Sequence, residues 1–186
     1  MATKDEILTR LLKEENYVSG EELARQTGVS RAAVWKAIKS LKKSGYDIEG
    51  VTKCGYKLKQ NNSLVTAEGV KALLEKDIEV THFDTVDSTN TYCKRLLADG
   101  KQGEFLVTAA KQTAGRGRQG KSFYSPSETG IYFSLVIRPD TSLQNAVTAT
   151  TAAAVAVCKA IEKTTDLKPK IKWVNDVYLN GKKVCG

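Results

Sequence analysis

The sequence lacks the marks of membrane, secreted and zinc-binding proteins. Its 186 residues contain no run of about 18 apolar residues, so we expect no membrane span. The first residues, Met1 to Asp5, contain no apolar signal-peptide region. The four cysteines lie far apart without a C-x-x-C pair, which argues against zinc knuckles and a disulfide framework and favours reduced thiols in a cytoplasmic protein. His82 is the single histidine, and we predict no metal-ligating residues.

The positive charge is concentrated in two regions. The chain carries 29 Lys and Arg against 21 Asp and Glu, a formal net charge of +8. Residues 1–28 have a net charge of −2, whereas residues 29–59 have eight basic and two acidic side chains, a net charge of +6. Residues 105–127 contain four basic side chains and no acid. Two separate basic regions indicate two anionic partners, or one polyanion and one phosphorylated small molecule.

The first sixty residues predict a winged helix-turn-helix. Thr3 and Glu6 form a capping box for a helix that ends near Asn16. Ser19 begins a short second helix that ends at Gly28, and a basic third helix runs from its cap, Ser30, to Gly45. Two short strands, 46–51 and 56–58, complete the pattern.

This pattern favours DNA binding, with a protein-interaction module as the alternative. A narrow helix fits the major groove, its first residues reach base edges, and its lysines neutralise phosphates. The predicted DNA-binding residues are Ser30, Arg31, Ala32, Trp35, Lys36, Lys39 and Lys53.

A glycine-rich basic loop at residues 115–122 matches two phosphate-binding patterns, G-x-G-x-x-G and G-x-x-x-x-G-K-[ST]. Both patterns require a helix after the loop, but residues 130–137 are aromatic and β-branched and predict a strand. We therefore reject the Walker and dinucleotide interpretations. Three glycines among basic side chains instead suit a loop that brings two negative groups together.

The remaining pattern is mixed α/β. A strand at about 79–86 leads to a helix that ends near Ala98, with Ser88, Thr89 and Asn90 at its entrance as ligand donors or as ordinary caps. Residues 145–162 predict an apolar, buried helix. Residues 171–179 predict two strands around a polar break, and Asn180-Gly181 predicts a tight hairpin. We interpret Asn175 and Asp176 as functional, with an edge-strand bulge as the alternative.

Three motifs, taken together, resemble those of the biotin–protein ligases. These are residues 87–90 (Asp-Ser-Thr-Asn), Gln112 with residues 115–120, and residues 172–177 with Lys183. With the winged helix in front, the chain looks like the bifunctional form that is also the biotin operon repressor. The resemblance implies an α+β fold: a winged helix-turn-helix at 1–60, a linker at 61–64, and the N-terminal portion of a biotin/lipoate-ligase-like catalytic domain at 65–186, with further segments expected beyond Gly186.

The implied reaction uses biotin, ATP and Mg²⁺. Biotinyl-AMP forms first, and a lysine in the biotin-acceptor domain of a carboxylase then takes the biotin. In this family biotinyl-AMP is also the corepressor, which favours a homodimer that binds operator DNA. The alternative is a DNA-binding regulator whose α/β part only senses a small acyl ligand. A lipoate-type ligase or transferase is a third possibility.

The resemblance also implies roles for individual residues, each carried over by its motif. The catalytic residues would be Arg116, Arg118 and Lys183. The biotin-binding residues would be Ser88, Thr89, Asn90, Gln112, Gly115, Arg116, Gly117, Arg118 and Lys183. The nucleotide-binding residues would be Asn90, Arg118, Lys121, Asn175 and Asp176.

Overall fold

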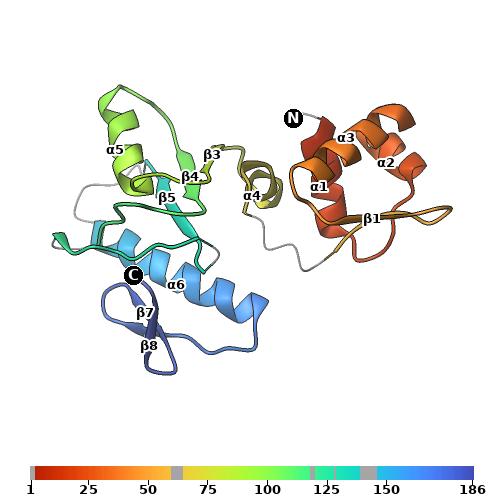
Figure 1. Cartoon of the computed structure of the whole chain (residues 1–186). Coiled ribbons are helices and arrows are strands. Elements are labelled where there is room, and N and C mark those ends of the chain that lie inside the picture. Colours follow the sequence, from red (N-terminus) through yellow and green to blue (C-terminus); the bar gives the residue numbers. More distant parts are fainter. Residues whose placement is uncertain (1–2, 60–64, 118–119, 128, 139–145) are drawn as a thin grey trace. The chain divides into compact units, whose positions relative to one another are not determined.

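The computed structural model describes residues 3–59, 65–117, 120–127, 129–138 and 146–186, and Figure 1 shows their helices and strands. The chain divides into two compact units, Met1–Ile137 and Arg138–Gly186, and each is described here by itself. The predicted linker at 61–64 and the basic residue Arg118 lie outside the described residues.

The N-terminal residues fold as the sequence predicts, into three helices and a two-stranded wing. These elements are α1 (Thr3–Lys13), α2 (Gly20–Thr27), α3 (Arg31–Lys43), β1 (Ile48–Val51) and β2 (Gly55–Leu58). Ser19 and Ser30 cap α2 and α3, because their hydroxyl oxygens accept hydrogen bonds from the third residue after each, Glu22 N at 3.0 Å and Ala33 N at 3.2 Å. Gly28 ends α2 with φ 67°. The expected cap at Thr3 is wrong, since Thr3 is already helical.

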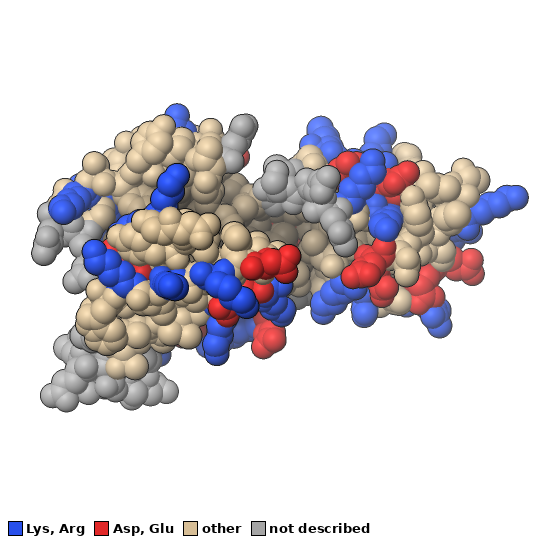
Figure 2. Space-filling view, turned by 90° about the horizontal axis from the view of Figure 1, so that it is seen from below, with Lys and Arg blue, Asp and Glu red and all other residues tan. Residues whose placement is uncertain are grey.

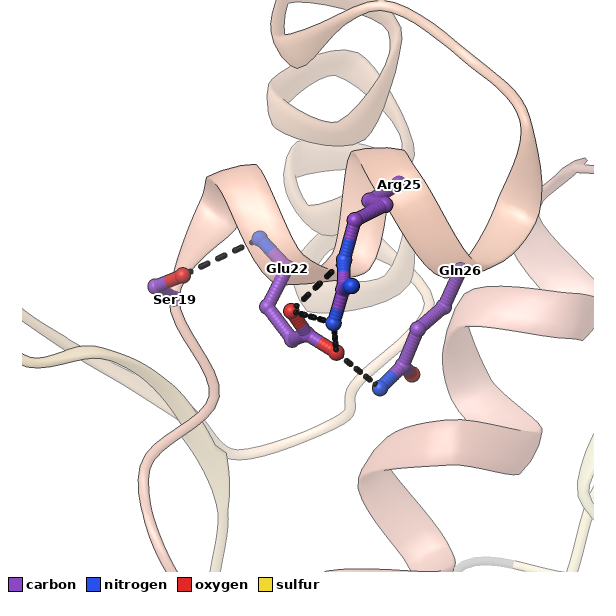
Figure 3. A network of polar contacts seen from close by, with 4 residues as sticks. All are labelled: Ser19, Glu22, Arg25 and Gln26. Carbon is purple, nitrogen blue, oxygen red and sulfur yellow. Dashed lines mark hydrogen bonds and ion pairs between the residues drawn. The ribbon is translucent and has the colours of Figure 1, made fainter.

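Side chains on α2 reinforce its first turn (Figure 3). The Glu22 carboxylate accepts hydrogen bonds from Arg25 at 2.6–3.1 Å and from the Gln26 amide at 2.5 Å. These donors hold the pKa of the Glu22 carboxyl below its ordinary value. The apolar faces of the three helices meet in one core with Ile48 and Leu58 of the wing, and Ile7, Leu8, Leu23 and Val34 are fully buried there.

Helix α4 (Ala67–Leu73) packs against both α1 and the strand β3 (Glu79–Phe83). Thr66 caps it by accepting a hydrogen bond from Gly69 N at 3.0 Å, and the same hydroxyl is hydrogen-bonded to Tyr46. Lys4 on α1 donates to Glu68 at 2.7 Å. These contacts tie α4 to the winged helix at two points.

A three-stranded sheet follows. Strand β3 pairs in parallel with β4 (Phe105–Ala109), and β4 pairs in antiparallel fashion with β5 (Tyr132–Val136). Helix α5 (Thr89–Ala98) connects β3 to β4 and packs against β4 and β5, burying Cys93 against Phe105 and Val107. Strand β3 ends at Phe83, earlier than predicted, although Val86 still forms an isolated parallel bridge with Gln112.

The second unit contains α6 (Ala146–Thr164) and an antiparallel sheet of β6 (Lys170–Lys172), β7 (Asp176–Leu179) and β8 (Lys182–Cys185). The predicted hairpin is confirmed: Asn180 and Gly181 both have positive φ, 48° and 77°. The prediction that the helix is buried is wrong, because most of the described side chains of α6 are exposed, Val155 to 38%, although Ala154 is buried. Within its own unit, α6 packs against β6 and β7. None of the described helices has the length and apolar character to cross a membrane.

Candidate functional site

Two segments that the sequence separates by some two dozen residues lie side by side at the ends of β3 and β4. Val86 N donates to the carbonyl oxygen of Lys111 at 3.1 Å, and Thr113 N donates to the carbonyl oxygen of Val86 at 2.9 Å. Ala114 N then donates to the carbonyl oxygen of Asp87 at 2.7 Å. This ladder brings the turn before α5 against the start of the glycine-rich loop, so the first two motifs meet.

The entrance of α5 is buried where the motif predicts ligand donors. Ser88 is the N-cap residue, and its hydroxyl oxygen accepts a hydrogen bond from Thr91 N at 3.4 Å. Ser88 and Thr89 are 2% and 3% exposed, whereas Asn90 is exposed. The ordinary capping role of Ser88 is therefore present, and Thr89 is the residue whose polar groups turn toward the loop.

Four polar side chains form a continuous hydrogen-bonded group, the Gln112 cluster, which consists of Thr89, Gln112, Ser125 and Ser134. The Gln112 Oε1 atom accepts hydrogen bonds from Thr89 N at 2.8 Å and from Thr89 Oγ1 at 3.2 Å. Gln112 Nε2 donates to Ser125 Oγ at 2.9 Å, and the hydroxyls of Thr89 and Ser134 lie 2.9 Å apart. The sequence predicted Thr89 and Gln112, and the structure brings them together.

Sequence reasoning missed Ser125 and Ser134. Ser125 is 3% exposed and donates to the carbonyl oxygen of Phe123 at 3.1 Å. Ser134 shares a face of β5 with Tyr132 and Val136, the face toward α5. Ser134 could have been found from the sequence, because a polar residue on the inward-facing side of a strand needs a hydrogen-bond partner inside the fold.

The described arms of the glycine-rich loop, residues 112–117 and 120–125, pair with each other as a hairpin, and the strand β5 follows it, as predicted. Its two arms are joined by three backbone hydrogen bonds: Gln112 N to Ser125 O at 3.0 Å, Phe123 N to Gly115 O at 2.8 Å, and Gly117 N to Lys121 O at 2.7 Å. Arg116 and Lys121 are exposed on it. A Cβ atom at Gly115 would lie 2.5 Å from Phe123 O and 2.8 Å from Ser125 Oγ, so only glycine fits there without a shift of the backbone.

An ion pair holds the turn before α5. Arg95 donates to both carboxylate oxygens of Asp87 at 2.6 and 3.0 Å, and its guanidinium carbon lies 5.6 Å from the centre of the Tyr92 ring. Arg95, followed by the Ser88 backbone N–H, lowers the pKa of the Asp87 carboxyl to about 2. Asp87 therefore stays ionised at neutral pH while its carbonyl oxygen accepts the hydrogen bond from the loop.

The predicted residues of the second unit lie around the β6–β7 turn. Asn175 is in the turn and Asp176 begins β7 opposite Lys172, and both are half-buried. The polar break therefore separates two antiparallel strands and does not lie inside one. Lys183 Nζ lies 2.9 Å from Asp176 Oδ1, so the residue assigned to biotin and the residue assigned to the nucleotide form an ion pair. In the parts of the chain that the structure describes, no group of three or more His, Cys, Asp or Glu residues is placed to hold a metal ion.

The predicted DNA-contacting residues are exposed on α3 and the wing. Arg31, Lys36 and Trp35 are exposed, and Lys39 Nζ lies 5.1 Å from the Trp35 ring centre. Residues of α2, α3 and the wing, Trp35 and Lys53 among them, line a groove of about 710 Å³. Figure 2 shows one face of the chain, on which acidic side chains lie among the basic ones.

Comparison with known proteins identifies the family. The sequence model of the Biotin/lipoate A/B protein ligase family matches residues 82–186, more than half of the chain. The chain belongs to this family. A second match, described as HTH domain, covers residues 3–57. The resemblance to biotin–protein ligases with a winged helix is thereby confirmed.

The relatives of this ligase-family chain include bacterial proteins with two named roles. It is 37% identical to the bifunctional ligase/repressor BirA of Bacillus spizizenii over 91% of this chain and 53% of the relative. It is 31% identical to BirA of Escherichia coli over 96% of this chain and 55% of the relative. The chain thus spans about half the length of these relatives. The solved biotin protein ligase from Aquifex aeolicus, in complex with biotin and ATP, matches at 32% identity with a TM-score of 0.50, over 57% of this chain and 44% of that one.

We predict that Gly115→Ala destabilises the base of the loop, because the new methyl group overlaps Phe123 O and crowds Ser125. Overpacking of this kind costs about 1–3 kcal/mol. Urea unfolding followed by circular dichroism measures the loss. The matched control is Gly117→Ala, whose methyl group would come no closer than 3.4 Å to Lys121. Equal unfolding midpoints for the two variants would contradict the close approach at Gly115.

We predict that Asp87 titrates at about pH 2, and that Arg95→Gln moves its pKa up toward the ordinary value. Because the pKa of Asp87 is lower in the folded than in the unfolded chain, the pair stabilises the fold above about pH 4, and this stabilisation disappears as the pH falls toward 2. NMR titration of the Asp87 carboxyl carbon measures both values. Lys94→Gln, at a neighbouring exposed position, should leave the pKa at about 2; an unchanged pKa in Arg95→Gln would refute the assignment.

Proposed function

We propose that the protein is an ATP-dependent biotin–protein ligase that also represses transcription in response to biotin. An oxygen of the biotin carboxylate attacks the α-phosphorus of ATP, the bond to the bridging oxygen breaks, and pyrophosphate leaves. The amine of a carboxylase lysine then attacks the acyl carbon of biotinyl-AMP, AMP leaves with the bonding electrons, and the nitrogen loses a proton. The observation that carries the proposal is the meeting of Thr89, Gln112 and Gly115 in a chain of this ligase family.

The biotin site in this proposal is built on the α5 entrance and the loop. Ser88, Thr89, Gln112 and the backbone of Gly115 and Gly117 supply neutral donors and acceptors, which suit the uncharged ring system of biotin. Thr89 and Ser88 are buried, so hydrogen bonds that they make to a ligand are shielded from water and are stronger than they would be at the surface. Asn90 is exposed beside them and is proposed to contact the ligand from the rim.

The cationic residues are proposed to offset the repulsion between a carboxylate and a triphosphate. Arg116, Arg118 and Lys183 would act in catalysis by stabilising charge that develops on the acyl phosphate, the general role of fixed cations in such sites. Lys121, Asn175 and Asp176 would bind the nucleotide. The Lys183 ammonium group lies 2.9 Å from Asp176 Oδ1, and this ion pair orients it in the absence of ligand. When biotin binds, its carboxylate would replace Asp176 as the partner of Lys183.

Mg²⁺ is proposed to arrive with ATP. The described residues offer carboxylate and amide oxygens at Asp176 and Asn175, the ligand type that Mg²⁺ prefers, but no cluster of three acidic groups. A site of this composition fits a metal that is held mainly by phosphate oxygens, with one or two protein ligands, and that neutralises phosphate charge when bound.

The winged helix is proposed to bind operator DNA, with biotinyl-AMP as corepressor and a homodimer as the binding form. Arg31, Trp35 and Lys36 would enter the major groove on α3, and Lys53 would contact the backbone from the wing. The biotin-acceptor domain of a carboxylase is the proposed protein partner, and the cytoplasm the proposed compartment, which fits four cysteines without a disulfide among them.

We predict biotin-dependent release of pyrophosphate from ATP by the protein extended to the full length of its relatives, measured with a coupled pyrophosphate assay. Gln112→Ala should reduce the apparent affinity for biotin by roughly tenfold or more, because buried hydrogen bonds of Thr89 lose their acceptor. Lys94→Ala, on the exposed surface of α5, should retain activity. Binding of biotin without pyrophosphate release would instead favour a regulator that only senses its ligand, and activity with lipoate in place of biotin would favour a lipoate ligase.

We predict that Lys36→Ala combined with Lys39→Ala weakens binding to duplex DNA and flattens its salt dependence. Each phosphate contact that is lost reduces the slope of log K against log salt by about 0.9. Fluorescence anisotropy of a labelled duplex across a salt series measures the slope. Lys13→Ala, on α1, is the control and should leave it unchanged; an unaltered slope in the double variant would show that α3 does not face the DNA.

A further inference from the structure

Ser125 and Ser134 lie at opposite ends of the Gln112 cluster. Neither serine belongs to the three motifs that resemble those of the biotin–protein ligases. Ser125 ends the return arm of the glycine-rich hairpin, where its backbone carbonyl accepts the hydrogen bond from Gln112 N. Ser134 is on β5, and its carbonyl oxygen is 3.9 Å from the Cys93 thiol of α5. The two serines therefore anchor the cluster to two separate structural elements.

The hydrogen bonds of Gln112 allow one orientation of its amide. Thr89 N–H can only donate, so the atom it meets at 2.8 Å must be Oε1, which leaves Nε2 facing Ser125. Ser125 gives its own hydrogen to Phe123 O, so its oxygen is available to accept from Nε2. A flipped amide would place Nε2 hydrogens against Thr89 N–H. Among these contacts, one Nε2–H of Gln112 remains for a ligand.

The hydrogen bond at Ser134 has one direction, because Thr89 has a single hydroxyl hydrogen to donate. Thr89 has one hydroxyl hydrogen, and it is donated to Gln112 Oε1 at 3.2 Å. Ser134 must therefore be the donor across the 2.9 Å contact with Thr89 Oγ1. This bond holds the Thr89 hydroxyl in the rotamer that reaches Gln112.

Burial makes this arrangement hard to replace with water. Thr89 and Ser125 are each 3% exposed, and Ser134 is half-buried. A buried donor or acceptor that loses its protein partner keeps the cost of its lost hydration, so a cluster with one member removed is left strained or rearranged.

We propose that Ser125 and Ser134 are positioning residues of the biotin site: Ser125 fixes the amide of Gln112, and Ser134 fixes the hydroxyl of Thr89. The proposed function supplies the ligand for this inference. Neither serine needs to touch biotin. Their effect is to have the remaining Nε2–H donor of Gln112 and the acceptor oxygen of the Thr89 hydroxyl already oriented when the ligand arrives, which reduces the ordering cost of binding.

The test compares Ser125→Ala and Ser134→Ala with Ser127→Ala, an exposed serine of the same chain segment. Isothermal titration calorimetry with biotin should give a Kd that is about tenfold higher for each of the first two variants, the change for one buried hydrogen bond. Ser127→Ala should match wild type. Ser134→Thr, which keeps the hydroxyl, should restore binding. ATP affinity, measured separately, should be equal in all variants, whereas general damage to the fold would lower it.

A second measurement keeps the inference separate from the choice of ligand. In NMR spectra without ligand, the Gln112 side-chain amide protons should exchange slowly in wild type and Ser127→Ala, and faster in Ser125→Ala. Biotin affinities that are equal in wild type, Ser125→Ala and Ser134→Ala would overturn the proposal, as would equal exchange rates. If wild type binds no biotin, the proposed function fails, and the exchange rates alone decide whether Ser125 positions Gln112.

Discussion

The two hydrogen bonds from Thr89 to the side-chain oxygen of Gln112 join the parts of this site. One comes from the first backbone N–H of α5 and the other from the adjacent hydroxyl. A helix leaves its first N–H groups without internal partners, and here the loop after β4 supplies a partner for one of them. The bonds thus couple the start of α5 to the glycine-rich hairpin, and Ser125 and Ser134 extend the coupling to the far arm of the hairpin and to β5.

The hairpin combines a fixed base with a charged, exposed end. At its base, Gln112 and Gly115 are held by backbone hydrogen bonds to the return arm, and Gly115 permits an approach that any side chain would block. Farther out, Arg116 and Lys121 are exposed to solvent. A loop of this kind can orient neutral donors before a ligand binds while its cations adapt to phosphate groups, which bind flexible ammonium and guanidinium groups well.

Sequence patterns correctly predicted the features that depend on residues close together in the chain, such as helix caps and tight turns. Ser19 and Ser30 cap helices within three residues of their partners, and the Asn180-Gly181 turn needs only the positive φ that these residues tolerate. The partners of Ser125 and Ser134 lie 13 and 45 residues away along the chain, at Gln112 and Thr89, and only the folded sheet brings them together. The motifs located Thr89 and Gln112 through family resemblance. The apolar composition of α6 predicted a buried helix, but most of its described side chains are exposed. Burial depends on which surfaces pack against a helix, and composition does not specify them.

The contacts of α4 with the winged helix determine where the chain can be cut to obtain the winged helix alone. Thr66 and Glu68 lie after the predicted linker, but their partners Tyr46 and Lys4 belong to the winged helix, and α4 packs against α1. A winged helix that ends at residue 60 would therefore expose the surface of α1 that α4 covers, and the Tyr46 hydroxyl would lose its hydrogen bond to Thr66. A fragment that extends through α4 keeps both of these partners of the winged helix, so a cut after α4 preserves contacts that a cut at residue 60 removes.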